Sequence, residues 1–314
     1  MNQNYAPITL FVYNRPDHTR RTVEALQQNV LSEESHLVVY SDAPKLNTHA
    51  EKVREVRQYI RQIHGFKTVT VIERETNFGL ANSIIDGVTR VCSEYGRVIV
   101  VEDDLVTSPF FLQYMNGALE IYENDEAVAS IHGYWYPVDQ PMPETFFLRG
   151  ADCWGWATWS RSWKSFESDG SKLLNELLRQ KLTSLFDLDG SISYTKMLRD
   201  QIAGRNNSWA IRWSASVFLA NCLQLSPGKS LVRNIGFDGT GTHCSASHAF
   251  NSDFAEYPIK VERKNPEESS EARAALIRYY RSSKRHICLR ILSRINRLTH
   301  NIFHRLLLLC KRYV

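Results

Sequence analysis

The stretch RVIVVEDDLVTSPFFLQYM, from Arg97 to Met115, places three adjacent acidic side chains directly after an apolar run. Val98–Val101 has the composition of a buried strand, and Glu102, Asp103 and Asp104 follow it. Adjacent carboxylates repel one another, and each is more stable in water than beside a core. A divalent cation would remove the repulsion, since carboxylate oxygens are ligands for Mg²⁺ and Mn²⁺. The alternative is a solvated acidic turn that caps the next helix.

The elements that would position these carboxylates alternate between strand and helix in the first half of the chain. This alternation predicts an α/β fold with a mostly parallel, doubly wound sheet, in which ligands bind at the carboxyl ends of the strands. The predicted strands are Ile8–Tyr13, His36–Ser41, Thr68–Glu73 and Val98–Val101, and the predicted helices are Asp17–Asn29, Ala50–Ile63, Leu80–Tyr95 and Pro109–Glu123.

Polar residues follow each of the other predicted strands as well. Arg15 comes after the first strand, Asp42 after the second, and the turn Asn77–Gly79 after the third. The planar guanidinium of an arginine binds phosphate oxygens with two hydrogen bonds, and a lone carboxylate can accept from the N3–H of uracil. Taken singly, Arg15 could simply precede a helix, and Asn77–Gly79 could simply form a turn, without any role in binding. Their joint placement at one sheet edge predicts a binding site.

Several classes of enzyme are excluded by missing motifs. Neither a Walker loop nor a G-x-G-x-x-G turn follows the first strand, which argues against a P-loop NTPase and a dinucleotide dehydrogenase. The chain has no G-x-S-x-G elbow, so a serine hydrolase of that class is not expected.

The second half is irregular and rich in aromatic residues, and all seven tryptophans follow the acidic triplet. We expect helices over Ser171–Leu182, Ser193–Ala203 and Trp209–Leu223, and a turn at Pro227. The predicted organisation is a nucleotide-type half over residues 1–130, an aromatic half over residues 131–265 of the same domain and a basic tail over residues 266–314.

These motifs carry a family resemblance. VVEDDLVTSPFFLQYM resembles the metal-site strand of GT-A glycosyltransferases, and is similar to that of N-acetylglucosaminyltransferases that build N-glycan branches. PITLFVYNRP resembles the first strand of bacterial family-2-type sugar transferases, and NFGLANSI their donor-contacting turn. CWGWATWSRSW and LVRNIGFDGTGTHC resemble parts of the acceptor half. The resemblance implies a GT-A fold and metal-dependent, inverting transfer of a hexosyl or N-acetylhexosaminyl group from a nucleotide sugar, a UDP-sugar by preference, to a glycan or lipid-linked acceptor.

The resemblance also implies roles for single residues. Asp104 would bind Mn²⁺ or Mg²⁺, and Glu102 and Asp103 would reach the ribose or the waters of the metal. Arg15 would hold the diphosphate and Asp42 the uracil, while His243, in the glycine-rich segment DGTGTHC, is either a further metal or phosphate ligand or a surface histidine. The remaining donor-binding residues implied are Asn14, Asn77, Gly79 and Leu80.

The catalytic base departs from the family pattern. Related enzymes carry an Asp in a Trp-Asp segment, whereas the corresponding stretch here, SWAIRW, has Ala210. An inverting enzyme needs a base to take the proton of the acceptor hydroxyl. Asp200 is the first candidate and Asp152 the second, and either could instead be a solvated carboxylate.

Aromatic residues near Asp152 predict the acceptor site. Trp154, Trp156 and Trp159 could present a stacking platform for a sugar ring, with Trp156 as the expected contact, or they could belong to the core. Two other functions fit the same fold. A sugar-phosphate nucleotidyltransferase would need a basic, glycine-rich loop that YNRPDHT lacks, and a non-catalytic carbohydrate-binding protein would explain Ala210.

The C-terminal tail differs from the rest of the chain in charge. Eleven Lys and Arg residues and no acidic residue follow Glu271, which leaves a net charge of −7 on the preceding part. Apolar residues recur every three or four positions from Ile291 to Leu309, so a basic amphipathic helix on an anionic membrane surface is expected. The alternatives are packing on the protein's own core and dimerisation.

The cellular setting is inferred from what the sequence lacks. The N-terminal residues do not form a signal peptide pattern, and the six cysteines are scattered without a C-x-x-C pair. We therefore expect a reduced, cytoplasmic protein, peripheral on the inner face of the membrane, with no nucleic-acid partner.

Overall fold

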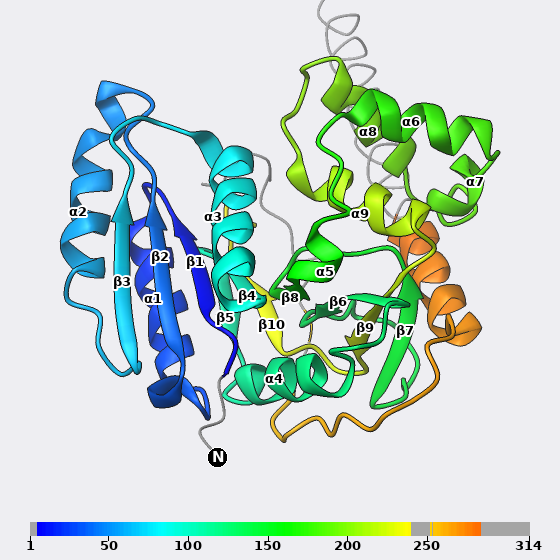
Figure 1. Cartoon of the computed structure of the whole chain (residues 1–314), viewed down its shortest axis with the longest axis horizontal. Helices are drawn as coiled ribbons and strands as arrows, with labels where there is room; N and C mark the ends of the chain where they lie inside the picture. The colour runs from blue at the N-terminus through cyan, green and yellow to red at the C-terminus, as the bar shows by residue number, and fades with distance from the viewer. Residues whose placement is uncertain (1–4, 240–251, 253, 284–314) are drawn as a thin grey trace, which may run out of the picture.

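The computed structural model describes residues 5–239, 252 and 254–283. An eight-stranded sheet with the order β3-β2-β1-β4-β8-β6-β9-β7 forms its centre (Figure 1). The first four strands are parallel to one another. They are β1 (Ile8–Val12), β2 (His36–Ser41), β3 (Thr68–Glu73) and β4 (Arg97–Glu102).

Side chains alternate between the two faces of these strands and so build two cores. Ile8 and Leu10 of β1 pack in one core with Val23 of α1, whereas Phe11 packs in the other with Ile84 of α3. Helices therefore cover both faces, as the α/β prediction requires. The helices of this half are α1 (Pro16–Gln27), α2 (Ala50–Ile60), α3 (Gly79–Tyr95) and α4 (Phe111–Ile121), with short 3₁₀ turns at Ser32–Glu34 and Asn47–His49.

The second half extends the same sheet. The strand β8 runs antiparallel between β4 and β6, β9 is parallel to β6, and β7 forms the antiparallel edge. A separate two-stranded ribbon pairs β5 with β10. The bounds of these strands are β5 Leu105–Thr107, β6 Val128–His132, β7 Thr145–Arg149, β8 Trp156–Trp159, β9 Leu223–Pro227 and β10 Val232–Asn234.

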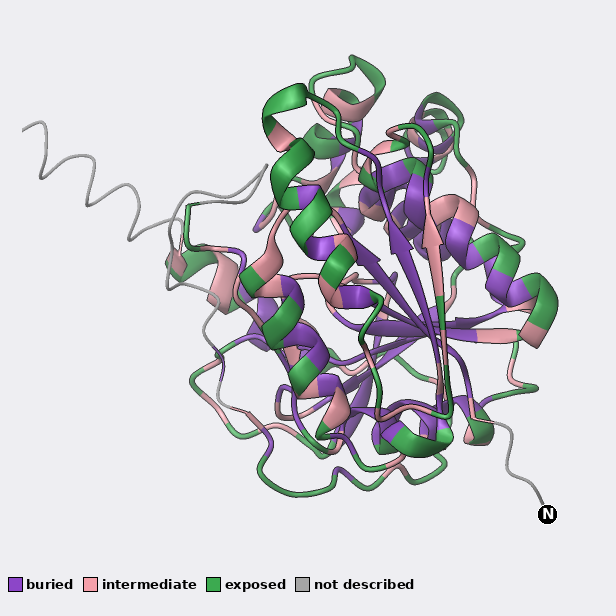
Figure 2. Ribbon diagram, turned by 90° about the vertical axis from the view of Figure 1, so that its left-hand side faces the viewer, coloured by how far each residue is buried: buried purple, intermediate pink, exposed green. Residues whose placement is uncertain are grey.

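Of the helices in the second half, α6, α7 and α8 lie above the sheet in Figure 1, and a last helix over residues 270–283 packs beside β7. The short helix α5 follows β8, and α9 packs over a face of the sheet beside α3. Figure 2 shows buried strands between helices whose outer faces are exposed. None of the helices in the described ranges is long and apolar enough to cross a membrane. The labelled helices are α5 Ser160–Trp163, α6 Gly170–Arg179, α7 Thr183–Phe186, α8 Tyr194–Ile202 and α9 Trp209–Leu219.

The α/β prediction is confirmed, and its strands and helices in the first half are found within a few residues of their expected ends. The helix predicted over Trp209–Leu223 is too long, because it ends at Leu219 and Leu223 begins β9. The division near residue 130 falls inside β6. Since β4 pairs with β8, the two halves share one sheet rather than forming separate bodies.

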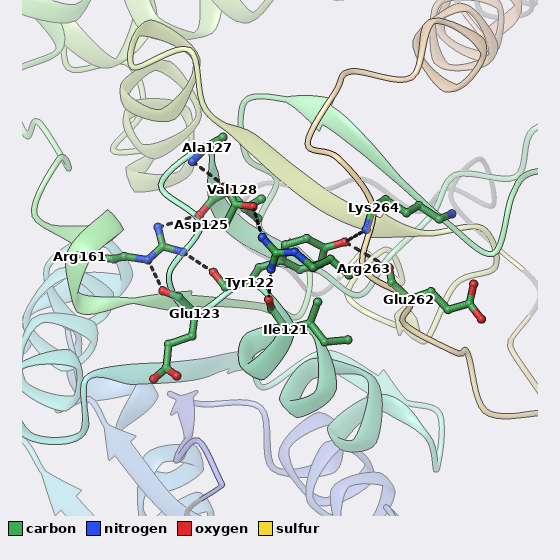
Figure 3. Close-up of polar contacts among 10 residues, drawn as sticks. All are labelled: Ile121, Tyr122, Glu123, Asp125, Ala127, Val128, Arg161, Glu262, Arg263 and Lys264. Atoms are coloured by element: carbon green, nitrogen blue, oxygen red, sulfur yellow. Dashed lines mark hydrogen bonds and ion pairs between the residues drawn. The ribbon is translucent and has the colours of Figure 1, made fainter.

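Arg161 stabilises the turn between α4 and β6, where the two halves of the chain meet, by donating to backbone carbonyls (Figure 3). Arg161 donates to the backbone oxygens of Tyr122, Glu123 and Val128 at 2.8, 2.7 and 2.9 Å. From the other side of the turn, Arg263 donates to the oxygen of Ile121 at 2.6 Å. Cations are favourable at a helix C-terminus because the last carbonyls lack helical partners. These contacts fix the exit of α4 toward β6 and anchor the segment that leads to the last helix.

Replacing this arginine tests that interpretation. Arg161→Ala leaves three backbone carbonyls without their charged donor, so we expect a loss of about 2–3 kcal/mol in unfolding free energy. Arg179→Ala is the matched control, because Arg179 is exposed and pairs only with Glu176 of its own helix. Urea unfolding of both variants measures the difference. Equal stabilities would contradict the anchoring role of Arg161.

Candidate active site

The carboxyl ends of β2, β1 and β4 are adjacent, and they bring the predicted site residues to one edge. Val12 is in register with Ser41, and Phe11 with Glu102. The next residues of each strand therefore emerge at the same level, with Asp42 on one side of the first strand and the acidic triplet on the other.

Arg15 faces the acidic triplet directly. Its Nη1 lies 2.8 Å from Oδ2 of Asp104 and 3.8 Å from Oδ1 of Asp103. Thr22 of α1 donates to the backbone oxygen of Asp103 at 2.8 Å, which holds the turn after β4 against the helix that follows Arg15. The Nε and Nη2 groups of Arg15 are buried and have no hydrogen-bond partner among the described residues. Two donors of the guanidinium therefore remain for an anion.

One arginine does not neutralise the crowded carboxyls. Burial and, after it, the charge of Asp104 raise the pKa of Glu102 well above its usual range. The same two causes raise the pKa of Asp103 to about 7. A divalent cation would relieve this repulsion, and the oxygen donors present suit Mg²⁺ or Mn²⁺.

No group of three His, Cys, Asp or Glu side chains in the described residues is arranged to hold a metal. Mg²⁺ in phosphate-transferring sites commonly takes one or two carboxylates and completes its shell with substrate oxygens and water. The residues present fit that mode, with Asp104, whose side chain is 21% exposed against 13% for Asp103, as the ligand. His243 lies outside the described residues.

Asp42 accepts four hydrogen bonds within the chain. The backbone N–H groups of Phe78 and Gly79, at the start of α3, donate to its two oxygens at 2.8 Å each. The Asn77 side chain and the Ala43 backbone donate at 3.1 and 2.9 Å. A carboxylate at a helix N-terminus is stabilised by the unpaired N–H groups there. Asp42 therefore fixes the turn, where Gly79 adopts a φ of +71° that favours glycine.

The segment after β10, part of the LVRNIGFDGTGTHC stretch singled out in the sequence, packs on Asp104. Ile235, just after β10, donates its backbone N–H to the backbone oxygen of Asp104 at 2.8 Å. The α-carbon of Gly236 packs so closely on the Asp104 carboxylate that a β-carbon would clash with Oδ2. Nearby, His18 Nε2 of α1 lies 3.1 Å from Asp238. The glycine in NIGFDG was the sequence signal for this close approach, whereas nothing in the sequence pointed to His18.

Asp152 lies in the loop between β7 and β8, next to Gln224 of β9. The Tyr136 hydroxyl donates to Oδ2 of Asp152 at 2.7 Å. The backbone N–H of Asp152 donates to the side-chain oxygen of Gln224 at 2.6 Å. Burial raises the pKa of the adjacent Cys153 thiol, and the charges of Asp152, Glu102 and Asp104 raise it further. The Cys153 thiol is therefore under the influence of the Asp152 carboxylate and of the acidic triplet.

Asp200 has a different environment on α8. Lys196 lies 2.5 Å from its Oδ2, and Arg205 donates two hydrogen bonds to its Oδ1. These hydrogen bonds lower the pKa of Asp200. A carboxylate whose oxygens are held by two cations is a weak proton acceptor. The geometry therefore favours Asp152 over Asp200 as the base.

The fold and these strand-end residues agree with one known family. The family described as "Glycosyl transferase family 2" matches residues 8–181, more than half of the chain. The chain belongs to glycosyltransferase family 2. The matched range contains the acidic triplet and Asp152, and it ends before Asp200.

Solved glycosyltransferases are similar only at low identity. The mannosyltransferase PcManGT of Pyrobaculum calidifontis, in complex with GDP-Man and Mn²⁺, is 14% identical with a TM-score of 0.29, covering 41% of this chain and 36% of its own. S. aureus TarS is 13% identical with a TM-score of 0.35, covering 52% and 30%, respectively. A structure of TarS residues 1–349 is 12% identical with a TM-score of 0.32, and the match covers 50% of this chain and 47% of that one. This chain thus spans less than half of each of these proteins. No curated protein matches the sequence.

The prediction that Trp156 contacts the acceptor is wrong for this family-2 chain. Trp156 is completely buried and stacks on Trp209 at 5.3 Å between ring centroids, with Trp163 and Trp213 on other sides. Trp156 is the first residue of β8, and its side chain packs in the core with Trp209 and Trp213 of α9. Trp154, two residues earlier, is only half-buried.

Proposed function

We propose that this family-2 glycosyltransferase transfers a sugar from a nucleotide-diphosphate donor, a UDP-sugar by preference, with a divalent metal and inversion at the anomeric carbon. The observation that carries the proposal is the cluster of Arg15, Asp103 and Asp104 at the ends of β1 and β4. It joins a cation with free donors to carboxylates that repel one another, and both features suit a metal-bound diphosphate.

On the donor side, Asp104 would hold the metal, and Arg15 would direct its Nε and Nη2 groups to the diphosphate. A metal bound there would act as a Lewis acid on the departing phosphoryl oxygen. Because Nη1 of Arg15 pairs with Asp104 at 2.8 Å, metal binding by Asp104 would compete with that contact, whereas Nε and Nη2 already lack partners among the described residues. Glu102 and Asp103 would reach the ribose or metal waters.

The nucleoside would bind beside the turn at the start of α3. Asn14, Asn77, Gly79 and Leu80 remain the proposed contacts, and Leu80 has an exposed fraction of 46%. The main role of Asp42 in this proposed nucleoside site is to fix the turn at the start of α3. A direct bond from uracil N3–H to Asp42 would have to displace or share one of the four donors already present.

On the acceptor side, Asp152 is the proposed base. Its carboxylate would take the proton of the acceptor hydroxyl while that oxygen forms the new bond to the anomeric carbon and the nucleoside diphosphate leaves. A single displacement of this kind inverts the anomeric centre. The half-buried Trp154 replaces Trp156 as the proposed sugar contact, because aromatic rings pack on the apolar faces of sugars.

A lipid-linked or membrane-proximal acceptor is proposed from the sequence of the tail. Residues 284–314, which hold the whole apolar stripe and eight of the eleven basic residues, lie outside the described residues. A basic amphipathic segment binds anionic bilayers by charge and apolar burial together. We expect the full chain to co-sediment with anionic liposomes at low salt and a chain that ends at Ser282 to stay in the supernatant. Equal sedimentation of both would contradict the proposal.

The metal site is tested by Asp104→Ala. We expect nucleotide release from a panel of UDP- and GDP-sugars, measured with Mn²⁺, to fall to about 1% of wild type or less, since the proposed metal ligand is lost. Removing one of several crowded carboxylates should leave the thermal midpoint of the metal-free protein unchanged or raise it. Asp17→Ala, at an exposed position in the first turn of α1, is the control and should retain activity. Wild-type, metal-stimulated turnover by the Asp104 variant would refute the proposed site.

Two further variants decide between the candidate bases. Asp152→Asn should slow kcat by roughly a hundredfold or more with little change in donor binding, because Asn cannot accept the proton. Asp200→Asn should leave kcat within about threefold of wild type, since that carboxylate is already held by Lys196 and Arg205. Single-turnover rates with saturating donor provide the comparison. The reverse order of effects would assign the base to Asp200.

A further inference from the structure

A small cavity of about 50 Å³ adjoins Asp152. It lies between the loop after β7, the helices α7 and α9, and the last helix over residues 270–283. In Figure 1 this last helix, in orange, lies beside β7 and below α7. A volume of this size holds roughly four water molecules, or one substituent with about as many heavy atoms. The cavity therefore has room for a side group of a sugar and not for a whole sugar ring.

Part of the lining is apolar and closely packed. The rings of Phe186 in α7 and Phe218 in α9 lie 5.1 Å apart between centroids, and both residues are buried. Leu148 of β7 and Leu276 of the last helix are buried in the same lining. An apolar surface of this kind binds a methyl group more favourably than it binds water.

Arg149, the last residue of β7, supplies hydrogen-bond donors beside this apolar surface. Its Nε–H donates to the carbonyl of Phe218 at 3.1 Å, and its guanidinium carbon lies 4.2 Å from the centre of the Phe218 ring. Its Nη1 and Nη2 groups form no hydrogen bond or ion pair with the rest of the described chain. Burial lowers the pKa of Arg149, although the charge of Glu268 raises it, so the guanidinium is partly desolvated. Two donor groups therefore remain for a ligand in the cavity.

Hydrogen-bond acceptors line the cavity as well. Oε1 of Glu268 accepts the backbone N–H of Arg149 at 3.1 Å, and its Oε2 has no hydrogen-bond partner among the described residues. The hydroxyl of Ser214 in α9 likewise forms no hydrogen bond within the described ranges. Arg273 is not available to a ligand, because both of its Nη groups pair with Asp189, at 2.9 and 2.8 Å. The groups left for a ligand are thus donors and acceptors together.

The charges around the cavity favour a neutral ligand. A phosphate or carboxylate would lie beside the carboxylates of Asp152 and Glu268, with only Arg149 to offset them. A hydroxymethyl group would satisfy polar atoms but leave the apolar surface in contact with water. An acetamido group has a methyl, a carbonyl oxygen and an N–H, in about four heavy atoms. It therefore matches the size of the cavity, the apolar surface, the Arg149 donors and the carboxylate acceptors.

The loop that carries Asp152 is held in place beside the cavity. Gly150, whose φ of +100° favours glycine, donates its backbone N–H to the oxygen of Cys222 at 3.2 Å. The backbone N–H of Asp152 donates to the side chain of Gln224, which lines the cavity too. A group bound in the cavity would therefore have a fixed position relative to the Asp152 carboxylate.

We propose that this cavity, which we call the Arg149 cavity, binds the acetamido group of an N-acetylated sugar in the acceptor. The proposal rests on the proposed function, in which Asp152 takes the proton of the acceptor hydroxyl. Because Asp152 lines the cavity, the sugar bound there is the one that carries the reactive hydroxyl. The acceptor is thereby narrowed from any glycan or lipid-linked sugar to one that contains an N-acetylhexosamine.

Saturation-transfer NMR of the full chain with UDP and Mn²⁺ tests the proposal without turnover. The probes are the methyl glycosides of N-acetylglucosamine and N-acetylgalactosamine, together with those of glucose and galactose. We expect the N-acetylated probes to bind at least about tenfold more tightly, as for one methyl group in an apolar site. Their acetyl methyl protons should receive more saturation than their ring protons. Equal binding of all the probes, or no binding of the N-acetylated pair, would overturn the proposal.

Two variants change the Arg149 cavity in different ways. Arg149→Met removes the Nη donors and keeps an apolar stem, and Ser214→Leu fills the space from α9. Each should weaken binding of the N-acetylated probes by about tenfold or more and leave the glucose and galactose probes unchanged. Arg179→Met is the matched control, because Arg179 is exposed and pairs with Glu176 of its own helix. An acetyl methyl signal of wild-type strength in either cavity variant would contradict the assignment.

Two readouts separate this proposal from the proposed function. Isothermal titration with UDP and Mn²⁺ should give wild-type affinity in Arg149→Met, since the proposed donor site lies at the ends of β1 and β4. Asp152→Asn should still bind the N-acetylated probes while losing transfer. Absence of an N-acetyl preference together with an inactive Asp152→Asn would refute only the role of the Arg149 cavity. An N-acetyl preference together with a fully active Asp152→Asn would refute the base and leave the ligand of the cavity in place.

Discussion

The repulsion among three carboxylates at the end of β4 is the constraint around which the rest of the site is arranged. The sheet order places β1 beside β4, so Arg15 reaches Asp104 at 2.8 Å, and the turn after β10 closes over the same carboxylate. These contacts reduce the repulsion without removing it, since the pKa of Asp103 is still raised to about 7. A fold that retains such an arrangement stores electrostatic free energy that a metal and a diphosphate would release.

The second half extends the same sheet and does not form a separate body. The antiparallel strand β8 joins β4 to β6, and the loop before β8 carries Asp152. Arg161 and Arg263 fix the turn between α4 and β6 from two directions. The segment that follows Arg263 then leads to the helix whose Tyr280 ring lies 5.4 Å from that of Tyr136. Elements from the start, middle and end of the described chain thus pack on one sheet.

The sequence was informative wherever local pattern and burial agree. β2 and β3 were predicted at their observed bounds: β2 is an almost continuous buried run, whereas β3, at the edge of the sheet, alternates Thr with Val and Ile. The triplet and Arg15 were predicted together because strand order places successive carboxyl ends at one edge. Trp156 was misjudged because the period of a strand, and not the chemistry of indole, decides which side chains face the core. The environment of Asp200 was not predicted because it depends on Arg205, five residues away across a turn. The short strands β6 to β10 were not predicted because each is set by pairing with strands that are distant in the sequence.

The central claim is that the edge formed by Arg15 and the acidic triplet binds a nucleoside diphosphate together with a divalent metal. Isothermal titration of the full chain with UDP, with and without Mn²⁺, measures this most directly. The account predicts binding that is at least about tenfold tighter with Mn²⁺ than in EDTA, because the metal would neutralise both the carboxylates and the diphosphate. UDP affinity that is the same with and without Mn²⁺, or no binding of UDP or GDP under either condition, would contradict it.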